Sequence, residues 1–224
     1  MITPELSFVL SLSIVFAAVI GIIRFRDIDR SYYPFLFNIW MVLLVEIGVF
    51  ILAQKGLRDP QIAVYNIFSL ADCLLFTTLF YQWSLFHKSR RTLFGLIGGF
   101  FFLWVILTFF VHGFTESNWY FRLIYSFALI FFSVTYFNKL VVGAKSSMLR
   151  NSRFLICLGL IIFYTFFTIV CATSLSLFGS DTEISKEFKR GLQTISIYSN
   201  VFVNLLYALA VLWIPRKKSF TTVY

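Results

Sequence analysis

Seven apolar stretches of about 20 residues, separated by short polar or charged segments, dominate this sequence. A helix needs roughly 20 apolar residues to cross the hydrocarbon core of a bilayer. The pattern therefore predicts an all-α, polytopic integral membrane protein in which residues 1–224 form a single domain of seven transmembrane helices. The predicted spans are 5–23, 34–53, 61–83, 92–112, 119–141, 154–178 and 191–213.

The composition excludes a water-soluble enzyme and a disordered chain. Hydrophobic residues make up 59% of the chain and charged residues 13%, whereas soluble domains carry about 25% charged residues. Seven spans use about 140 residues, which leaves no room for a soluble catalytic domain. No proline lies inside a span, so each span is expected to be an uninterrupted helix. The four prolines are Pro4, Pro34, Pro60 and Pro215.

The distribution of basic residues predicts how the chain sits in the cell membrane. With the N-terminus outside, 13 of the 19 Lys and Arg residues become cytoplasmic and six lie outside. Cytoplasmic loops are enriched in Lys and Arg, so the split favours an outer N-terminus and a cytoplasmic C-terminus. The charge follows the first span, which is therefore expected to be a retained helix. The 13 residues are Arg24, Arg26, Arg30, Lys88, Arg90, Arg91, Lys139, Lys145, Arg150, Arg153, Arg216, Lys217 and Lys218.

Two carboxylates, Glu46 and Asp72, lie deep inside predicted spans. An ionised acid at the bilayer centre costs roughly 3 kcal/mol or more. Counting along the two helices places both residues at similar depth. They are candidates for a proton or cation site or for an anchor of a polar ligand. The alternative is a protonated acid that only hydrogen-bonds a neighbouring helix.

Polar side chains form stripes along three predicted spans. Lipid cannot satisfy such groups, so the stripes must face protein or a water-filled cavity. The stripe in span seven lies within about 80° at 100° per residue, and it comprises Gln193, Ser196, Asn200, Asn204 and Tyr207. The stripe in span three comprises Tyr65, Ser69 and Asp72, and that in span five comprises Arg122, Tyr125, Ser126, Ser133 and Tyr136. The predicted site is lined by Glu46, Asp72, Asn200 and Asn204, with Asn38, Asn66, Ser69, Gln193 and Tyr198 behind them.

Arg122 and a glycine pair support two further hypotheses. Arg122 is expected to extend to the outer surface near Glu116, and an ion pair or gate with Glu46 is the alternative. Gly95 and Gly99 form a GxxxG pattern in span four, which permits close helix packing in the bundle or in a homodimer.

A weak internal repeat relates residues 66–83 to residues 196–213, with five identities in 18 positions. A parallel repeat of spans one to three and five to seven around a lone fourth span fits this alignment. Some small-solute transporters are built on parallel repeats. The alternative is chance similarity between two apolar helices.

These patterns favour a membrane protein that binds and transports a small polar solute or cation between spans two, three and seven. A seven-helix sensor coupled to a cytoplasmic partner and a structural membrane subunit are the alternatives. The sequence lacks the HExxH, GxSxG and P-loop motifs, so no enzyme activity, cofactor or metal site is expected. Its basic residues lie in short clusters between apolar runs, so the expected partner is the lipid bilayer and not nucleic acid.

Overall fold

The computed structural model describes residues 4–86, 89–143, 148–175 and 183–216. These residues are helical and form no β-sheet; one isolated bridge joins Ile28 to Arg216. Seven helical segments are long and apolar enough to cross a membrane, which confirms the predicted number of spans. The helices are α1 (Pro4–Ser11), α2 (Ile14–Arg24), α3 (Tyr33–Gln54), α4 (Arg58–Gln82), α5 (Arg90–Val105), α6 (Trp119–Gly143), α7 (Ser152–Ser174) and α8 (Glu183–Leu212).

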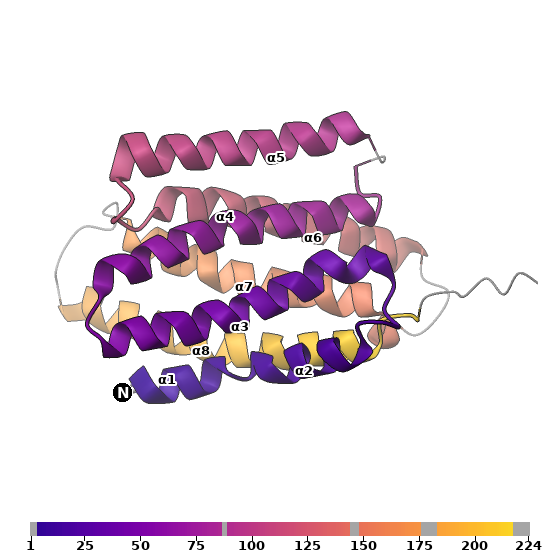
Figure 1. The fold of residues 1–224 in the computed structure, drawn as a ribbon, viewed down its shortest axis with the longest axis horizontal. Helices are drawn as coiled ribbons and strands as arrows, with labels where there is room; N and C mark the ends of the chain where they lie inside the picture. The colour runs from indigo at the N-terminus through magenta and orange to yellow at the C-terminus, as the bar shows by residue number, and fades with distance from the viewer. Residues whose placement is uncertain (1–3, 87–88, 144–147, 176–182, 217–224) are drawn as a thin grey trace, which may run out of the picture.

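Three short helices, η1 (Arg30–Tyr32), η2 (Ile106–His112) and η3 (Met148–Arg150), lie in or beside the connections. The helices run parallel or antiparallel to one another, so the bundle has two ends (Figure 1). We call the end where the chain begins the N-terminal end. The opposite end, which holds Arg216, is the C-terminal end. The predicted cytoplasmic residues Lys88, Lys145, Lys217 and Lys218 lie outside the described residues, as do residues 176–178 of span six.

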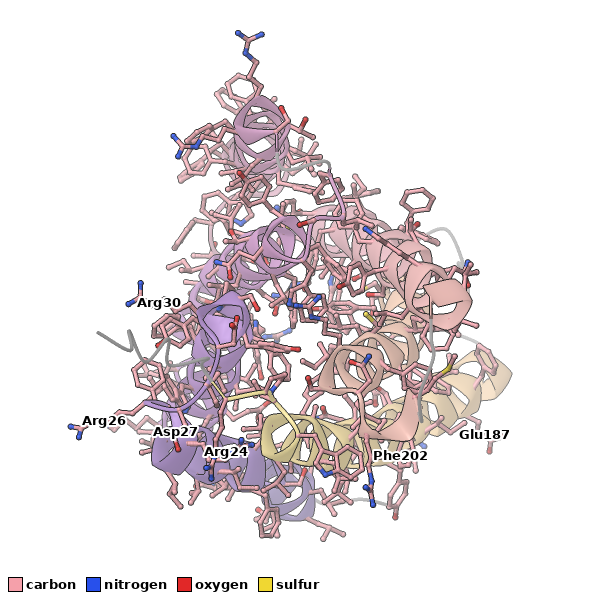
Figure 2. All side chains as sticks on the ribbon, turned by 90° about the vertical axis from the view of Figure 1, so that its right-hand side faces the viewer. Arg24, Arg26, Asp27, Arg30, Glu187 and Phe202 are labelled. Atoms are coloured by element: carbon pink, nitrogen blue, oxygen red, sulfur yellow. The ribbon has the colours of Figure 1, made fainter. Side chains whose placement is uncertain are left out.

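Six of the spans form a closed ring in the order α2, α3, α4, α6, α7 and α8, with α8 packed against α2 (Figures 1 and 2). Helix α1 extends α2 toward the N-terminal end and packs against α3 and α8. The ring places spans one to three on one side and spans five to seven on the other. This order of neighbours is compatible with a parallel repeat of three helices.

Helix α5, the fourth span, lies outside the ring and packs on α4 and α6 (Figure 2). Trp104 is its one buried residue, and η2 continues the helix as a π-helical segment. Gly95 and Gly99 are exposed, and a Cβ atom added at either would meet no described atom within 4 Å. The GxxxG pattern is therefore not used for packing inside the bundle, and a homodimer through it stays a prediction.

The first span is broken, which corrects the expectation of an uninterrupted helix. Helix α1 ends at Ser11 and α2 begins at Ile14. Between them the Ser13 amide bonds the Leu10 carbonyl at 3.2 Å, three residues back instead of four. Neither proline nor glycine occupies the break. The physical cause is a side chain from another helix: Asn204 of α8 donates to the Ser13 hydroxyl at 2.9 Å and to the Ser11 carbonyl at 3.5 Å.

The last span, Arg190–Leu212, agrees with the predicted 191–213 within one residue, but the helix that contains it is longer. Helix α8 begins at Glu183, eight residues before the predicted start at 191. Its extra turns carry charged residues, which membrane-span counting excludes. The other spans begin and end within a few residues of their predicted limits.

An aromatic plug, defined as Tyr32, Phe80, Trp83, Phe132 and Tyr136, occupies the C-terminal end of the ring. All five side chains are at most 8% exposed, and successive ring centroids lie 5.1–6.0 Å apart. Edge-to-face and tilted ring contacts at such distances are favourable. The plug joins η1, α4 and α6.

Arg153 connects a fourth helix, α7, to the plug. Its guanidinium donates to the hydroxyl of Tyr136 at 2.8 Å and to that of Tyr32 at 3.2 Å. It also lies 5.7 Å from the ring centroids of Tyr32 and Trp83. One cation thus holds three aromatic side chains by charge-assisted hydrogen bonds and cation–π contacts.

Arg24 closes the same end on the opposite side of the ring. Its guanidinium donates to the Val211 carbonyl at 2.6 Å, to the Ile214 carbonyl at 3.0 Å and to the Leu212 carbonyl. Val211 and Leu212 are the last two residues of α8, where carbonyls lack a partner within the helix, and Ile214 follows the helix. A cation at a helix C-terminus is also favoured by the helix dipole. Arg24 therefore ties the first span to the last.

Candidate functional site

A cavity of about 450 Å³ lies at the centre of the ring. Ligand pockets typically measure roughly 300–1,000 Å³. Within the described residues α1, α3, α4, α6, α7 and α8 contribute polar side chains to its wall, whereas α5 contributes none. The polar lining residues are Ser7, Ser11, Asn38, Glu46, Tyr65, Ser69, Asp72, Trp119, Arg122, Tyr125, Tyr164, Ser196, Asn200, Asn204 and Tyr207.

The cavity occupies the part of the ring that reaches toward the N-terminal end. Its wall includes Ser7 in α1, Tyr65 in the second turn of α4 and Trp119, the first residue of α6. In the other direction it reaches Phe76. The plug begins one turn further with Phe80, which does not line the cavity. The cavity therefore approaches the N-terminal end and is separated from the C-terminal end by packed aromatic side chains.

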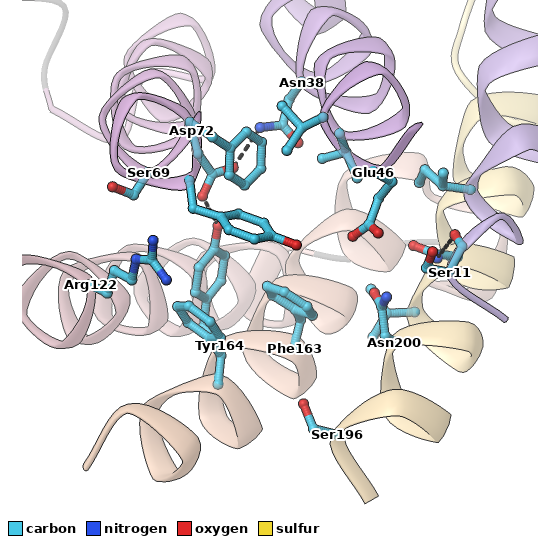
Figure 3. A pocket seen from close by; sticks show the side chains of 18 of the residues that line it. Ser11, Asn38, Glu46, Ser69, Asp72, Arg122, Phe163, Tyr164, Ser196 and Asn200 are labelled. Atoms are coloured by element: carbon cyan, nitrogen blue, oxygen red, sulfur yellow. Dashed lines mark hydrogen bonds between the residues drawn. The ribbon is translucent and has the colours of Figure 1, made fainter. Parts of the chain in front are cut away.

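Asp72 is the most enclosed carboxylate of the cavity, with 4% of its surface exposed. Asn38 donates to its Oδ1 at 2.6 Å, and the Tyr164 hydroxyl donates to its Oδ2 (Figure 3). Asp72 thus links α3, α4 and α7, and both of its oxygens already accept hydrogen bonds.

Glu46 differs from Asp72 because its carboxylate faces the open part of the cavity. In Figure 3 the side chain points into the cavity beside Ser11, and Asn200 lies on the adjoining wall. It is partly buried, and no Lys or Arg of the described residues forms an ion pair with it. Glu46 is thus an acid inside a membrane-spanning segment without a compensating cation.

Arg122 lies on the wall opposite Glu46 (Figure 3). It is 8% exposed, so it does not extend to the surface as expected. Its guanidinium carbon lies 5.1 Å from the Trp119 ring centroid and 5.6 Å from the Tyr65 ring centroid. Its Nη2 donates to Asn66 Oδ1 at 3.5 Å, and its Nε finds no partner among the described residues. Neither Glu46 nor Glu116 forms an ion pair with it in the described part of the chain.

Asn66, predicted to stand behind the site, is completely buried but does not line the cavity. Its amide donates to the carbonyls of Phe114 at 3.2 Å and Glu116 at 2.8 Å. Its Oδ1 accepts from the Asn118 amide at 3.2 Å. Asn66 thus anchors the connection between η2 and α6. It contacts the cavity wall through Arg122 and through Ser69, whose hydroxyl donates to the Asn66 carbonyl at 2.8 Å.

The polar stripes point where the sequence analysis expected, with exceptions at one end of α8. Ser196, Asn200, Asn204 and Tyr207 line the cavity, whereas Gln193 is exposed. The whole α4 stripe lines the cavity, and Arg122 and Tyr125 do so from α6. Among the other predicted residues, Asn38 and Ser69 line the cavity. Tyr198 is 56% exposed and faces away from the bundle.

Tyr164, Ser7 and Ser11 were not predicted as site residues. Tyr164 is a polar side chain in a span of apolar residues, and nothing in its spacing distinguishes it from an interfacial aromatic residue. Ser7 and Ser11 share a helix face that the sequence suggests for packing. Their periodicity is a usable signal, because a serine stripe can equally face a cavity.

The cavity holds two carboxylates, and the described residues contain no group of three or more His, Cys, Asp or Glu side chains suited to a metal ion. The three cysteines, Cys73, Cys157 and Cys171, are buried and free, as their apolar surroundings in the sequence suggest.

Comparisons with protein families, with curated proteins and with solved structures find no match.

Proposed function

We propose that this protein binds a small polar solute or cation in the central cavity and transports it across the cell membrane. The observation that carries the proposal is the lining of the cavity. Side chains from six helices place acid, amide, hydroxyl and guanidinium groups around about 450 Å³ of space inside a bundle of membrane-length helices. Polar groups at such depth are expensive and usually mark a substrate or ion pathway.

The different closure of the two ends supports a transport cycle. The cavity approaches the N-terminal end, which the charge distribution places outside, and the aromatic plug closes the cytoplasmic end. Alternating access requires such a closed end to open when the other closes. The two sets of three helices provide two bodies that can rock against each other around the cavity. The interruption of the first span after Ser11, which lines the cavity, provides a point at which this helix can bend.

The roles proposed for the two carboxylates follow from their surroundings. Glu46 faces the open space and contacts the ligand, because its oxygens are not occupied by a cation. Asp72 holds Asn38 and Tyr164 and carries the proton or transmits ligand binding between the two halves of the ring. Asn200 and Asn204 complete the polar wall from α8.

Thiol labelling from each side of the membrane tests this function. In a variant whose three cysteines are replaced by alanine, Asn200→Cys should react with a membrane-impermeant methanethiosulfonate added to the outer side. Tyr198→Cys is the matched control, because it lies two residues away on the same helix but is 56% exposed on the lipid-facing surface. Phe80→Cys, in the plug, should react from the cytoplasmic side once the cavity opens there.

An unreactive Asn200→Cys would show a dry interior and would overturn the proposal in favour of a structural subunit. Reaction of Asn200→Cys from outside together with complete protection of Phe80→Cys from inside would contradict transport. That pattern fits a sensor that binds a ligand in the same cavity without releasing it to the cytoplasm.

A further inference from the structure

Arg122 and Glu46 lie on opposite walls of the cavity (Figure 3) and form no ion pair. The third ionisable side chain of the wall, Asp72, accepts hydrogen bonds at both of its carboxylate oxygens. Tyr65 also lines the cavity, and its ring centroid lies 5.6 Å from the Arg122 guanidinium carbon. An isolated charge inside a membrane is unfavourable. Groups of opposite charge that share a cavity without pairing therefore call for a ligand that compensates both.

Arg122 is prepared for an anion. A guanidinium has five N–H donors in a planar fork, which suits a carboxylate. Only Nη2 makes a hydrogen bond to another described residue, and that bond is 3.5 Å long. The Arg122 side chain is only 8% exposed, and its buried Nε has no hydrogen-bond partner among the described residues. A buried donor left unsatisfied destabilises the folded protein, so an oxygen acceptor on a ligand would recover this free energy.

Glu46 is prepared for a cation, and Asp72 is not. Both Asp72 oxygens accept from neighbouring side chains, so Asp72 is already satisfied. Glu46 forms no ion pair with a described residue, and the hydroxyl of the neighbouring Ser11 donates to the Phe8 carbonyl at 2.8 Å. The cavity wall also includes the aromatic side chains of Phe163 and Phe167, which favour an organic cation through cation–π contact.

We propose that the ligand of this cavity is a small zwitterion of the amino-acid type, with its anionic group on Arg122 and its ammonium group on Glu46. The proposal rests on the proposed function and specifies its substrate class. A simple cation would be attracted by Glu46 but repelled by Arg122, and a simple anion would meet the reverse. Only a ligand with both charges neutralises both walls at once. The apolar and aromatic lining between them accommodates the rest of the molecule.

Binding to the purified full-length protein tests the substrate class. The panel comprises the twenty standard L-amino acids, glycine betaine and taurine, with thermal stabilisation as the first readout and calorimetry for the compound that binds best. A ligand that binds the folded state raises the melting temperature. The methyl ester of the best compound removes its anion, and the N-acetyl form removes its cation. Each lost charge-assisted contact should weaken binding roughly 10- to 100-fold.

Charge-matched variants assign each end of the ligand. In Glu46→Gln the N-acetyl form should bind as well as the zwitterion, and in Arg122→Gln the methyl ester should do so. Each comparison is the ratio of two affinities, for the derivative and for the zwitterion, measured in the same variant, so it does not depend on the stability of that variant. Arg122→Lys keeps the positive charge and should still bind the zwitterion more tightly than the ester. Glu187→Gln, an exposed carboxylate on α8, is the control that should leave both ratios unchanged.

If no compound in the panel binds, or the singly charged derivatives bind the unaltered protein as tightly as the zwitterion, the substrate class is wrong. The labelling experiment is independent of this result. A reactive Asn200→Cys with no zwitterion binding would overturn the substrate class and leave the transport proposal standing.

Discussion

The C-terminal end of the ring and the cavity differ in how their charged side chains are paired. At the C-terminal end Arg153 is satisfied by the hydroxyls of Tyr32 and Tyr136, and Arg24 is satisfied by carbonyls at the end of α8. In the cavity Arg122 keeps a buried donor without a described partner, and Glu46 has no cation. Both regions carry arginine within the same bundle. The comparison shows that the arginines that hold the helices together have hydrogen-bond partners for their guanidinium groups, whereas the guanidinium that lines the cavity keeps a donor for a ligand. Neutral donors do not follow this division, because Trp83 Nε1 of the plug also lacks a described partner.

Arg153→Ala should have the largest effect on stability. It removes two hydrogen bonds to tyrosine hydroxyls and a cation that stacks on two rings, at a cost of about 2–4 kcal/mol in the free energy of unfolding. Thermal unfolding in detergent measures the change. Arg150→Ala is the matched control, because Arg150 is exposed at the same end. Equal stabilities of the two variants would show that the plug is not held by Arg153.

Glu46→Gln should affect function strongly and stability little. Uptake of the tightest-binding zwitterion into proteoliposomes should fall at least tenfold, because one charge-assisted contact with the ligand is lost. The melting temperature without ligand should stay unchanged or rise, since the substitution removes from the membrane interior an acid that has no cationic partner. A large loss of stability in Glu46→Gln would instead place Glu46 with the structural groups of the plug.

Gly159→Ala should affect both the stability of the bundle and ligand binding in the cavity. A Cβ at residue 159 of α7 would lie 2.5 Å from Cε1 of Tyr207, which lines the cavity from α8. The ring must move, which should destabilise the bundle by about 1–3 kcal/mol and narrow the cavity. Ligand affinity and the unfolding midpoint are the measurements. Gly98→Ala, on the exposed face of α5 with no described atom nearby, is the control.

Ser84→Gly should have the smallest effect and the opposite sign. Ser84 follows α4 with a φ of 60°, a left-handed conformation that glycine adopts without strain. Its amide bonds the Tyr81 carbonyl and the next amide bonds the Phe80 carbonyl, so the turn itself is retained. We expect a gain of about 0.5–1 kcal/mol in unfolding free energy and no change in ligand binding. A loss of stability would show that the serine side chain contributes to this end.

The seven spans could be predicted because membrane insertion is governed by local hydrophobicity, which a sequence states directly. The stripes that contain Asp72 and Asn200 could be predicted for a similar reason, since helical periodicity decides which residues share a face. Tyr164 could not, because its role depends on Asp72 of another helix. The break after Ser11 could not either, because Asn204 lies 191 positions from its partner Ser13 in the chain.

The sequence by itself determined that this chain is a bundle of membrane-length helices and which polar residues must turn away from lipid. Those properties follow from transfer free energies and from the period of the helix, which need no knowledge of neighbours. Only the tertiary structure decided that α5 lies outside the ring, that Asp72 is satisfied and Glu46 is not, and that Arg122 is buried opposite Glu46. Whether a polar group has hydrogen-bond partners depends on the atoms that folding places around it. The amino-acid sequence does not state the distances between those atoms.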